Sequence, residues 1–164
     1  MSPTEPLADL RFSHLVVGVT DMDRALAFYQ GLLGMDVVFD QLLGGQSFDD
    51  ALNSTSSHQG RAVGGVVGGV MLELLSLGSA PTGRPSRSIV GNQNISLSVS
   101  DLDDTHRRVA AAGYEPEQAP FEIEGVRMFF VKDPDGTRVE FIEFPAPART
   151  SYELHRGAST GDAE

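Results

Sequence analysis

The sequence predicts an α+β fold in which two paired βαβββ modules form a cleft of curved mixed sheets, with the helices on the outside. The first observation behind this is an internal repeat, because residues 14–23 match residues 94–103 at about half the chain length. The second is that further strand-like runs follow the helical pattern after each copy of the repeat. The third is a strong turn signal, Asp133-Pro134-Asp135-Gly136, between the last two runs.

Each repeat begins as a strand of alternating apolar and polar residues and continues into a helical pattern. Thr20 and Asp23 stand three apart before the first helix, as Ser100 and Asp103 do before the second. This spacing is typical of a capping box, in which the hydroxyl accepts a bond from a free N–H group of the first turn. The helical patterns end at glycines, residues 34 and 113, which is the usual position for a helix stop.

Three strand-like runs follow each helix. In the first half they cover residues 35–41, 61–68 and 70–77; in the second half they cover 115–121, 127–132 and 138–144, of which the first is weak. We therefore expect an N-terminal extension (1–9), one domain (10–144) and a loosely ordered tail (145–164). Within the domain, module one spans 10–78, a linker rich in Pro, Gly and Ser spans 79–91, and module two spans 92–144.

An insertion over residues 42–60 separates two strands of the first module and has no counterpart in the second. It is rich in Gly, Ser, Asp and Asn, and long loops without a pattern are often lids, binding loops or disordered segments. We interpret it as a lid over the concave face. His58 lies within it and could complete a metal site from the lid, although a loop histidine is more often simply exposed.

Composition excludes several classes of function. The chain has 164 residues, 12 Lys and Arg against 23 Asp and Glu, a formal net charge of -11 and no cysteine. So negative a surface repels nucleic acid and anionic lipid, and the lack of cysteine excludes disulfides and thiolate metal sites. No apolar run approaches the roughly 20 residues that span a bilayer. The first residues carry acids and prolines rather than a signal sequence, so we expect a cytoplasmic protein without nucleic-acid or membrane partners.

Strand alternation selects four candidate site residues. Leu15, Val17 and Val19 form one face of the first strand and leave His14 on the other. The same reasoning places Asn94, Glu73 and Glu140 on the faces that the helices do not cover. A carboxylate set among Met and Leu must be paired, protonated or bound to a metal, because an isolated buried charge is very costly.

If the uncovered faces of the two halves line one cleft, these four side chains converge there. One imidazole, two carboxylates and one amide oxygen suit a divalent first-row metal such as Mn, Fe, Co, Ni or Zn, with room for substrate oxygens. The sequence therefore predicts a metal site of His14, Glu73, Asn94 and Glu140. Taken alone, His14 would more often be a core histidine with satisfied hydrogen bonds.

Four stretches of the chain resemble the vicinal oxygen chelate superfamily, which includes glyoxalase I, methylmalonyl-CoA epimerase, extradiol dioxygenases and bleomycin-resistance proteins. They are HLVVGVTDMDRALAFYQGLLGM, VMLELLS, NISLSVSDLDDTHRRVAAAGY and DPDGTRVEFIE, and the resemblance covers about residues 10–144. In the enzymes of that family the ligands lie on the first and last strand of each module. Carried over, they fall on His14, Glu73, Asn94 and Glu140, with Asn94 standing where the metal isomerases carry histidine.

The resemblance implies a metal-dependent lyase or isomerase of the glyoxalase and epimerase type, acting on a small carbonyl metabolite through a metal-stabilised enediolate. Glu140 and Glu73 would be ligands that also act as acid and base. The alternative is a non-catalytic protein that binds or sequesters a small molecule, as bleomycin-resistance proteins do. An extradiol-type dioxygenase fits less well, because Asn94 replaces the second histidine of its iron site. Family members also imply a homodimer.

Other polar residues have simpler interpretations. We expect Glu143 to be a solvated acid at a strand end, and His106 and His155 to lie on the surface. The glycine-rich run at residues 63–69 lacks the context of a phosphate loop, so it indicates strand glycines that permit bends or a close approach. Arg84 and Arg87 in the linker could meet an anionic substrate, although linker arginines usually face solvent.

Overall fold

The computed structural model describes residues 11–51, 55–77 and 94–158. Module one consists of β1 (Leu15–Gly18), α1 (Met22–Leu26), η1 (Ala27–Leu32), β2 (Asp36–Gly44), α2 (Gln46–Ala51), β3 (Gln59–Val67) and β4 (Val70–Ser76). Module two consists of β5 (Ile95–Ser98), α3 (Leu102–Ala111), β6 (Phe121–Ile123), β7 (Val126–Lys132) and β8 (Arg138–Glu143), and α4 (Ser151–Ala158) follows it. The N-terminal extension and the linker with Arg84 and Arg87 lie outside the described residues.

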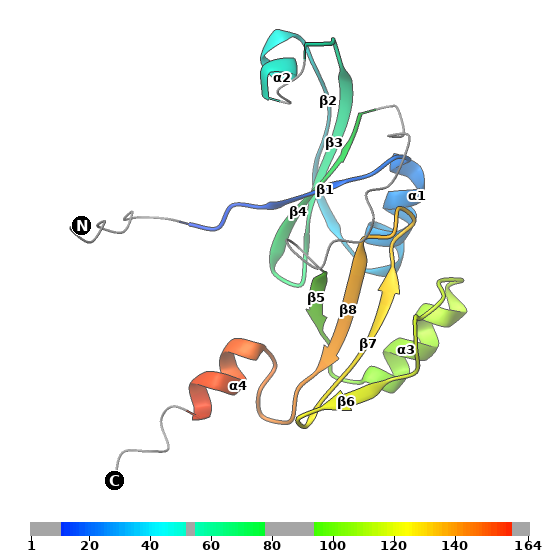
Figure 1. The fold of residues 1–164 in the computed structure, drawn as a ribbon, viewed down its shortest axis with the longest axis vertical. Helices are drawn as coiled ribbons and strands as arrows, with labels where there is room; N and C mark the ends of the chain where they lie inside the picture. The colour runs from blue at the N-terminus through cyan, green and yellow to red at the C-terminus, as the bar shows by residue number, and fades with distance from the viewer. Residues whose placement is uncertain (1–10, 52–54, 78–93, 159–164) are drawn as a thin grey trace, which may run out of the picture.

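Each module forms a four-stranded mixed sheet, with strand order β1-β4-β3-β2 in the first and β5-β8-β7-β6 in the second (Figure 1). β1 runs parallel to β4 and β5 runs parallel to β8, whereas the remaining neighbours are antiparallel. Two βαβββ units related by an internal repeat are therefore confirmed. No helix in the described ranges is long and apolar enough to cross a membrane.

The helices cover one face of each sheet, as the alternation predicts. Val17, Leu72 and Leu74 are buried on the covered side of the first sheet, and Val139 and Phe141 are buried in the second. These side chains belong to one hydrophobic core that extends through both modules. We call the uncovered side of each sheet its open face. Val16 shows the contrast, because it alternates with Val17 and is 47% exposed.

The helix starts differ from the predicted capping boxes. Asp21 caps α1 by accepting from the backbone N–H groups of Asp23 and Arg24, and Asp101 caps α3 by accepting from Asp104. Aspartate is as good an N-cap as a hydroxyl residue, because its carboxylate also favours the positive end of the helix. Thr20 is thereby free for another role, and its hydroxyl and backbone N–H both donate to Asp135 in module two.

The junction between the modules contains a buried acid. Tyr29 on η1 is fully buried and donates its hydroxyl to Asp133 Oδ2 at 3.0 Å, across 104 residues of sequence. Asp133 also accepts the backbone N–H groups of Asp135 and Thr137 in the predicted hairpin turn. Burial raises the pKa of both Asp133 and Tyr29 above their ordinary values. Phe28 adds an edge-on ring contact to Tyr114 of module two.

Three segments differ from the expectation. The weak run at 115–121 does not form a full strand; the pairing residues are Phe121–Ile123, and Pro116 contributes only an isolated bridge to Val131. Within the tail, residues Ser151–Ala158 form α4, a helix that the sequence pattern did not indicate. The insertion is not a plain loop, since β2 extends to Gly44, α2 follows and β3 begins at Gln59. α2 places Phe48 above Gly60, where an added Cβ would lie 2.9 Å from the ring.

Candidate functional site

The first half of the candidate site lies where β1 and β4 run side by side. Val16 is paired with Glu73 in the parallel register, so His14, two residues earlier, shares the open face with this carboxylate. His14 Nε2 lies 3.7 Å from Glu73 Oε2, and the side chains are 37% and 20% exposed. The pairing that a carboxylate among apolar neighbours requires is therefore present, and both groups remain accessible from the open face.

The second half has the same construction in module two. Ser96 is paired with Glu140 in the β5–β8 register, and Asn94 precedes it by two residues. Asn94 Nδ2 donates to Glu140 Oε2 at 3.3 Å, and the pair is partly buried. Parallel strands at equivalent positions of the repeat thus give each module one carboxylate with one nitrogen-bearing neighbour.

The structure brings the four residues together as two pairs and not as one cluster. Within residues 11–51, 55–77 and 94–158, no group of three or more His, Asp or Glu side chains is close enough to hold a metal ion. The modules join through their covered sides, where the shared core lies, and this packing does not unite the open faces into one four-residue site. Each module presents half of the predicted donor set.

A basic residue beside Glu140 is an additional feature of the second open face. Arg138 lies two residues before Glu140 on β8, and its Cζ lies 3.6 Å from the centre of the Phe130 ring. Its Nε donates to Glu117 Oε2 at 2.7 Å, and Lys132 Nζ lies 3.3 Å from the other oxygen. Burial raises the pKa of Glu117, but the hydrogen bonds and charges of Arg138 and Lys132 outweigh it and hold the pKa below its ordinary 4.5.

Arg138 was not among the predicted site residues, although a signal for it existed. In a strand, residues two apart share a face, so the alternation that selects Glu140 also selects Arg138. What the sequence did not show is that Glu117, in the segment before β6, would bind the guanidinium. The arginine is therefore neutralised within its own module.

Glu143 is not a solvated acid, which corrects the sequence-based interpretation. Its Oε2 accepts the backbone N–H of Leu102 at 2.6 Å, and its Oε1 lies 3.4 Å from Arg127 Nη1. The carboxylate therefore sits at the N-terminus of α3, where the free N–H groups and the helix dipole favour negative charge.

The remaining histidines lie outside the two pairs. His58 donates its backbone N–H to the buried Asp49 at 2.7 Å, and its Nδ1 is buried 3.4 Å from the same carboxylate without a hydrogen bond. His106 is half-buried rather than on the surface, because its ring packs edge-on against Phe129. His155 is exposed on α4, as expected.

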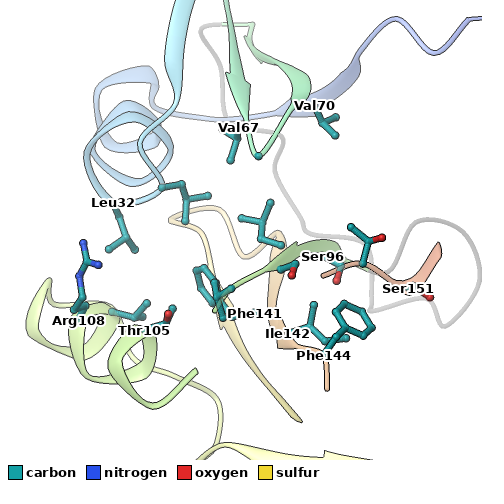
Figure 2. Close-up of a pocket in the computed structure, with 17 residues that line it drawn as sticks. Leu32, Val67, Val70, Ser96, Thr105, Arg108, Phe141, Ile142, Phe144 and Ser151 are labelled. Carbon is teal, nitrogen blue, oxygen red and sulfur yellow. The ribbon is translucent and has the colours of Figure 1, made fainter. Parts of the chain in front are cut away.

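A cavity of about 570 Å³ lies at the junction of the modules, beside β5 (Figure 2). It is bounded by the end of η1, the β3–β4 turn, β5, α3, β8 and the segment leading into α4. Ten of its lining residues are apolar aliphatic or aromatic: Leu32, Leu33, Val67, Val70, Leu97, Val99, Val109, Phe141, Ile142 and Phe144. Arg108 is the charged residue of this lining, which contains no carboxylate or imidazole. The cavity adjoins the second half-site at Ser96 but supplies no anionic metal ligand.

The comparisons with known proteins agree with this architecture. Residues 11–141 match the family model described as the Glyoxalase/Bleomycin resistance protein/Dioxygenase superfamily. The chain belongs to this superfamily. The resemblance of the four stretches is thereby confirmed over nearly the whole range expected for it. No curated protein sequence matches the chain.

Solved structures of the superfamily share the fold at low sequence identity. A glyoxalase family protein from Bacillus cereus is 19% identical with a TM-score of 0.70, and the match covers 87% of this chain and 97% of that one. The fosfomycin resistance protein of Listeria monocytogenes is 15% identical with a TM-score of 0.59, over 87% and 99% of the chains. The lactoylglutathione lyase of Agrobacterium tumefaciens is 22% identical with a TM-score of 0.54, over 85% and 96%.

Proposed function

We propose that this protein is a metal-dependent lyase or isomerase of the glyoxalase and epimerase type, acting on a small carbonyl metabolite. The observation that carries the proposal is the equivalence of the two half-sites. In each module the parallel pair of strands places a glutamate beside a second donor on the open face. A repeat that served only to build a core would not need an accessible carboxylate at this position in both copies.

The donor set fits a divalent first-row metal. His14 offers an imidazole nitrogen, Glu73 and Glu140 offer carboxylate oxygens, and Asn94 offers an amide oxygen once its side chain rotates away from Glu140. A bound ion would polarise a substrate carbonyl and make the neighbouring C–H bond more acidic. Because the amide is neutral, we expect weaker metal binding than a histidine at residue 94 would give.

In this proposal the chain's own groups move the proton. Glu73 and Glu140, one on each open face, act as base and acid on the two sides of the substrate. Both are only partly buried, so each remains open to a ligand on its face. His14 lies 3.7 Å from Glu73 and restrains that carboxylate on its side of the site.

The complete site requires two copies of the chain. One chain presents its half-sites separately, so a four-residue shell forms when module one of one copy faces module two of another. A two-fold dimer makes this contact twice and completes two sites at once. We therefore propose a homodimer in which His14 and Glu73 act together with Asn94 and Glu140 of the partner subunit.

Elemental analysis tests the proposal directly. Protein purified without chelator should contain about one first-row metal ion per chain, and Glu140→Gln should lose most of it because a carboxylate ligand becomes a weaker amide. Asn94→His should bind the metal more tightly. Glu122→Gln is the matched control, because this exposed glutamate lies on the same sheet. Wild-type protein without metal after reconstitution, or Glu140→Gln that keeps its metal, would contradict the assignment.

Sequestration of a cationic small molecule is the second candidate, and the net charge of -11 favours it. A sequestering cleft needs shape and charge but no proton transfer. Glu140→Gln therefore separates the two functions: a metal-dependent activity should collapse in this variant, whereas binding of a bulky cation should survive the loss of one negative charge.

A further inference from the structure

The open face of module one has an apolar side next to the pair formed by His14 and Glu73. The strand register places Val16, Glu73, Gly64 and Phe39 in one row across the four strands. Directly paired residues project to the same face, so the Phe39 ring and the Glu73 carboxylate flank Gly64 from opposite sides. All three side chains in this row are partly accessible.

Gly64 makes room for the ring. A Cβ added at this position would collide with Cε1 and Cζ of Phe39 and would lie 2.7 Å from Cε of Met71. The ring and the thioether therefore lie directly over the glycine backbone, in space that any side chain would fill. The sequence predicted that glycines in this run permit a close approach, and here the approaching groups come from the same sheet.

Apart from His14, the charged residues that the strands place on this face are acidic. By the strand register, the side chains other than Glu73 that β1 to β4 place on it are apolar, apart from the uncharged Gln41 and the acidic Asp36, which is paired with Val66. Arg61 on β3 belongs to the opposite face, where it pairs with Asp40 at 2.7 Å and lies 3.7 Å from Asp23. Among the described strands of this sheet, no cation is therefore available for a phosphate or a second carboxylate of a substrate.

We propose that Phe39 and Met71 form the apolar wall of the substrate site. The substrate would carry a flat apolar group, such as an aromatic ring, next to the oxygen atoms that would bind the metal. Gly64 is then a specificity-determining residue, because it lets the wall lie close to Glu73. This inference rests on the proposed function and adds the substrate class: arylated small carbonyl compounds rather than phosphorylated or multiply charged ones. Ring contacts with Phe39 and sulfur contacts with Met71 supply the selectivity.

Phenylglyoxylate and pyruvate are suitable probes, because both present a ketone beside a carboxylate. They differ only in the group on the ketone carbon, which is phenyl in phenylglyoxylate and methyl in pyruvate. Phenylglyoxylate also lacks a removable C–H, so it binds without reacting. Calorimetric titration of protein purified without chelator should give about tenfold tighter binding of phenylglyoxylate, which is the order of selectivity expected from an aromatic contact plus the extra buried area.

Gly64→Ala should abolish this selectivity by displacing Phe39 and Met71. Gly18→Ala is the matched control, because it adds a methyl group to the same face at a position with nothing within 4 Å. Phe39→Leu provides a second variant that keeps the glycine and removes only the ring; it too should lose most of the selectivity.

The possible outcomes separate the two proposals. Equal affinity of the wild type for both acids overturns the apolar wall and leaves the metal site standing. Selectivity that persists in both Gly64→Ala and Phe39→Leu also overturns it, because the preference then arises elsewhere. Failure of both acids to bind, in protein that also takes up no metal, overturns the proposed function and with it the inference.

Discussion

Glu117 shows how single residues beside the candidate site are held in their charge states. One oxygen of its carboxylate accepts a hydrogen bond from Arg138, and the other forms an ion pair with Lys132. The contacts that neutralise Arg138 therefore also hold the segment before β6 in place. Arg138 in turn covers the Phe130 ring. The charge nearest to Glu140 on the strand is thus committed to structure, which leaves Glu140 bonded to Asn94.

The lowered pKa of Glu117 predicts a pH-dependent contribution to stability. A carboxyl whose pKa is lower in the folded than in the unfolded state stabilises the fold above its ordinary pKa of 4.5. That contribution disappears as the pH falls through 4.5 toward the folded-state pKa. Glu117→Gln should therefore be less stable than wild type in urea at neutral pH, by about 1 kcal/mol or less because the pair is near the surface. A difference that persists undiminished at about pH 3 would contradict the assignment.

At the scale of elements, carboxylates rather than hydroxyls organise both helix starts. The sequence indicated where α1 and α3 begin, but three candidate caps stood within four positions at each start, and local spacing does not choose among them. Tertiary contacts determine which residue caps each helix. Thr20 donates to Asp135, and Glu143 on β8 accepts the first N–H of α3. An acid 41 residues away in sequence leaves no signal in a local capping pattern.

Removing the Glu143 carboxylate should therefore destabilise the packing of α3 on the second sheet. In Glu143→Ala the N–H of Leu102 loses its acceptor and Arg127 loses one of its two acidic partners. We expect a loss of about 1 kcal/mol in the free energy of unfolding, the usual size of a lost helix cap. Urea denaturation measures this, and Glu115→Ala, at an exposed carboxylate in the same module, is the control. Equal stability of the two variants would show that Glu143 adds no capping energy.

For the whole molecule, the repeat and the strand alternation sufficed to predict the two βαβββ modules and the sheet faces of the four candidate residues, although the structure holds these residues as two pairs and not as the one cluster expected. Both follow from local patterns, because parallel neighbours at equivalent positions share a face. How the modules join was not predictable in this way. The junction depends on contacts such as Tyr29 with Asp133 and Phe28 with Tyr114, which are made by residues far apart in sequence. From the sequence, Asp133 was interpreted only as part of a turn.

This junction has a testable consequence for the assembled site. If His14 and Glu73 of one chain work with Asn94 and Glu140 of another, two defective chains can complement each other. Glu73→Gln is intact in module two and Glu140→Gln is intact in module one, so a mixed dimer contains one site with all four native residues and one with both substitutions. When the two variants are unfolded, mixed in equal amounts and refolded, random pairing should restore about a quarter of the wild-type metal content.

Elemental analysis of the mixture measures this recovery, with each variant refolded alone as the reference. Both references should stay near the metal-free level, because every site in them lacks one carboxylate. The pair of chains must also migrate as a dimer on size-exclusion chromatography. A mixture that holds no more metal than the two references, although it is dimeric, would place all four ligands within a single chain. It would then require the modules to rearrange so that their open faces meet, at the expense of the buried Tyr29 and Asp133 contact that now joins them.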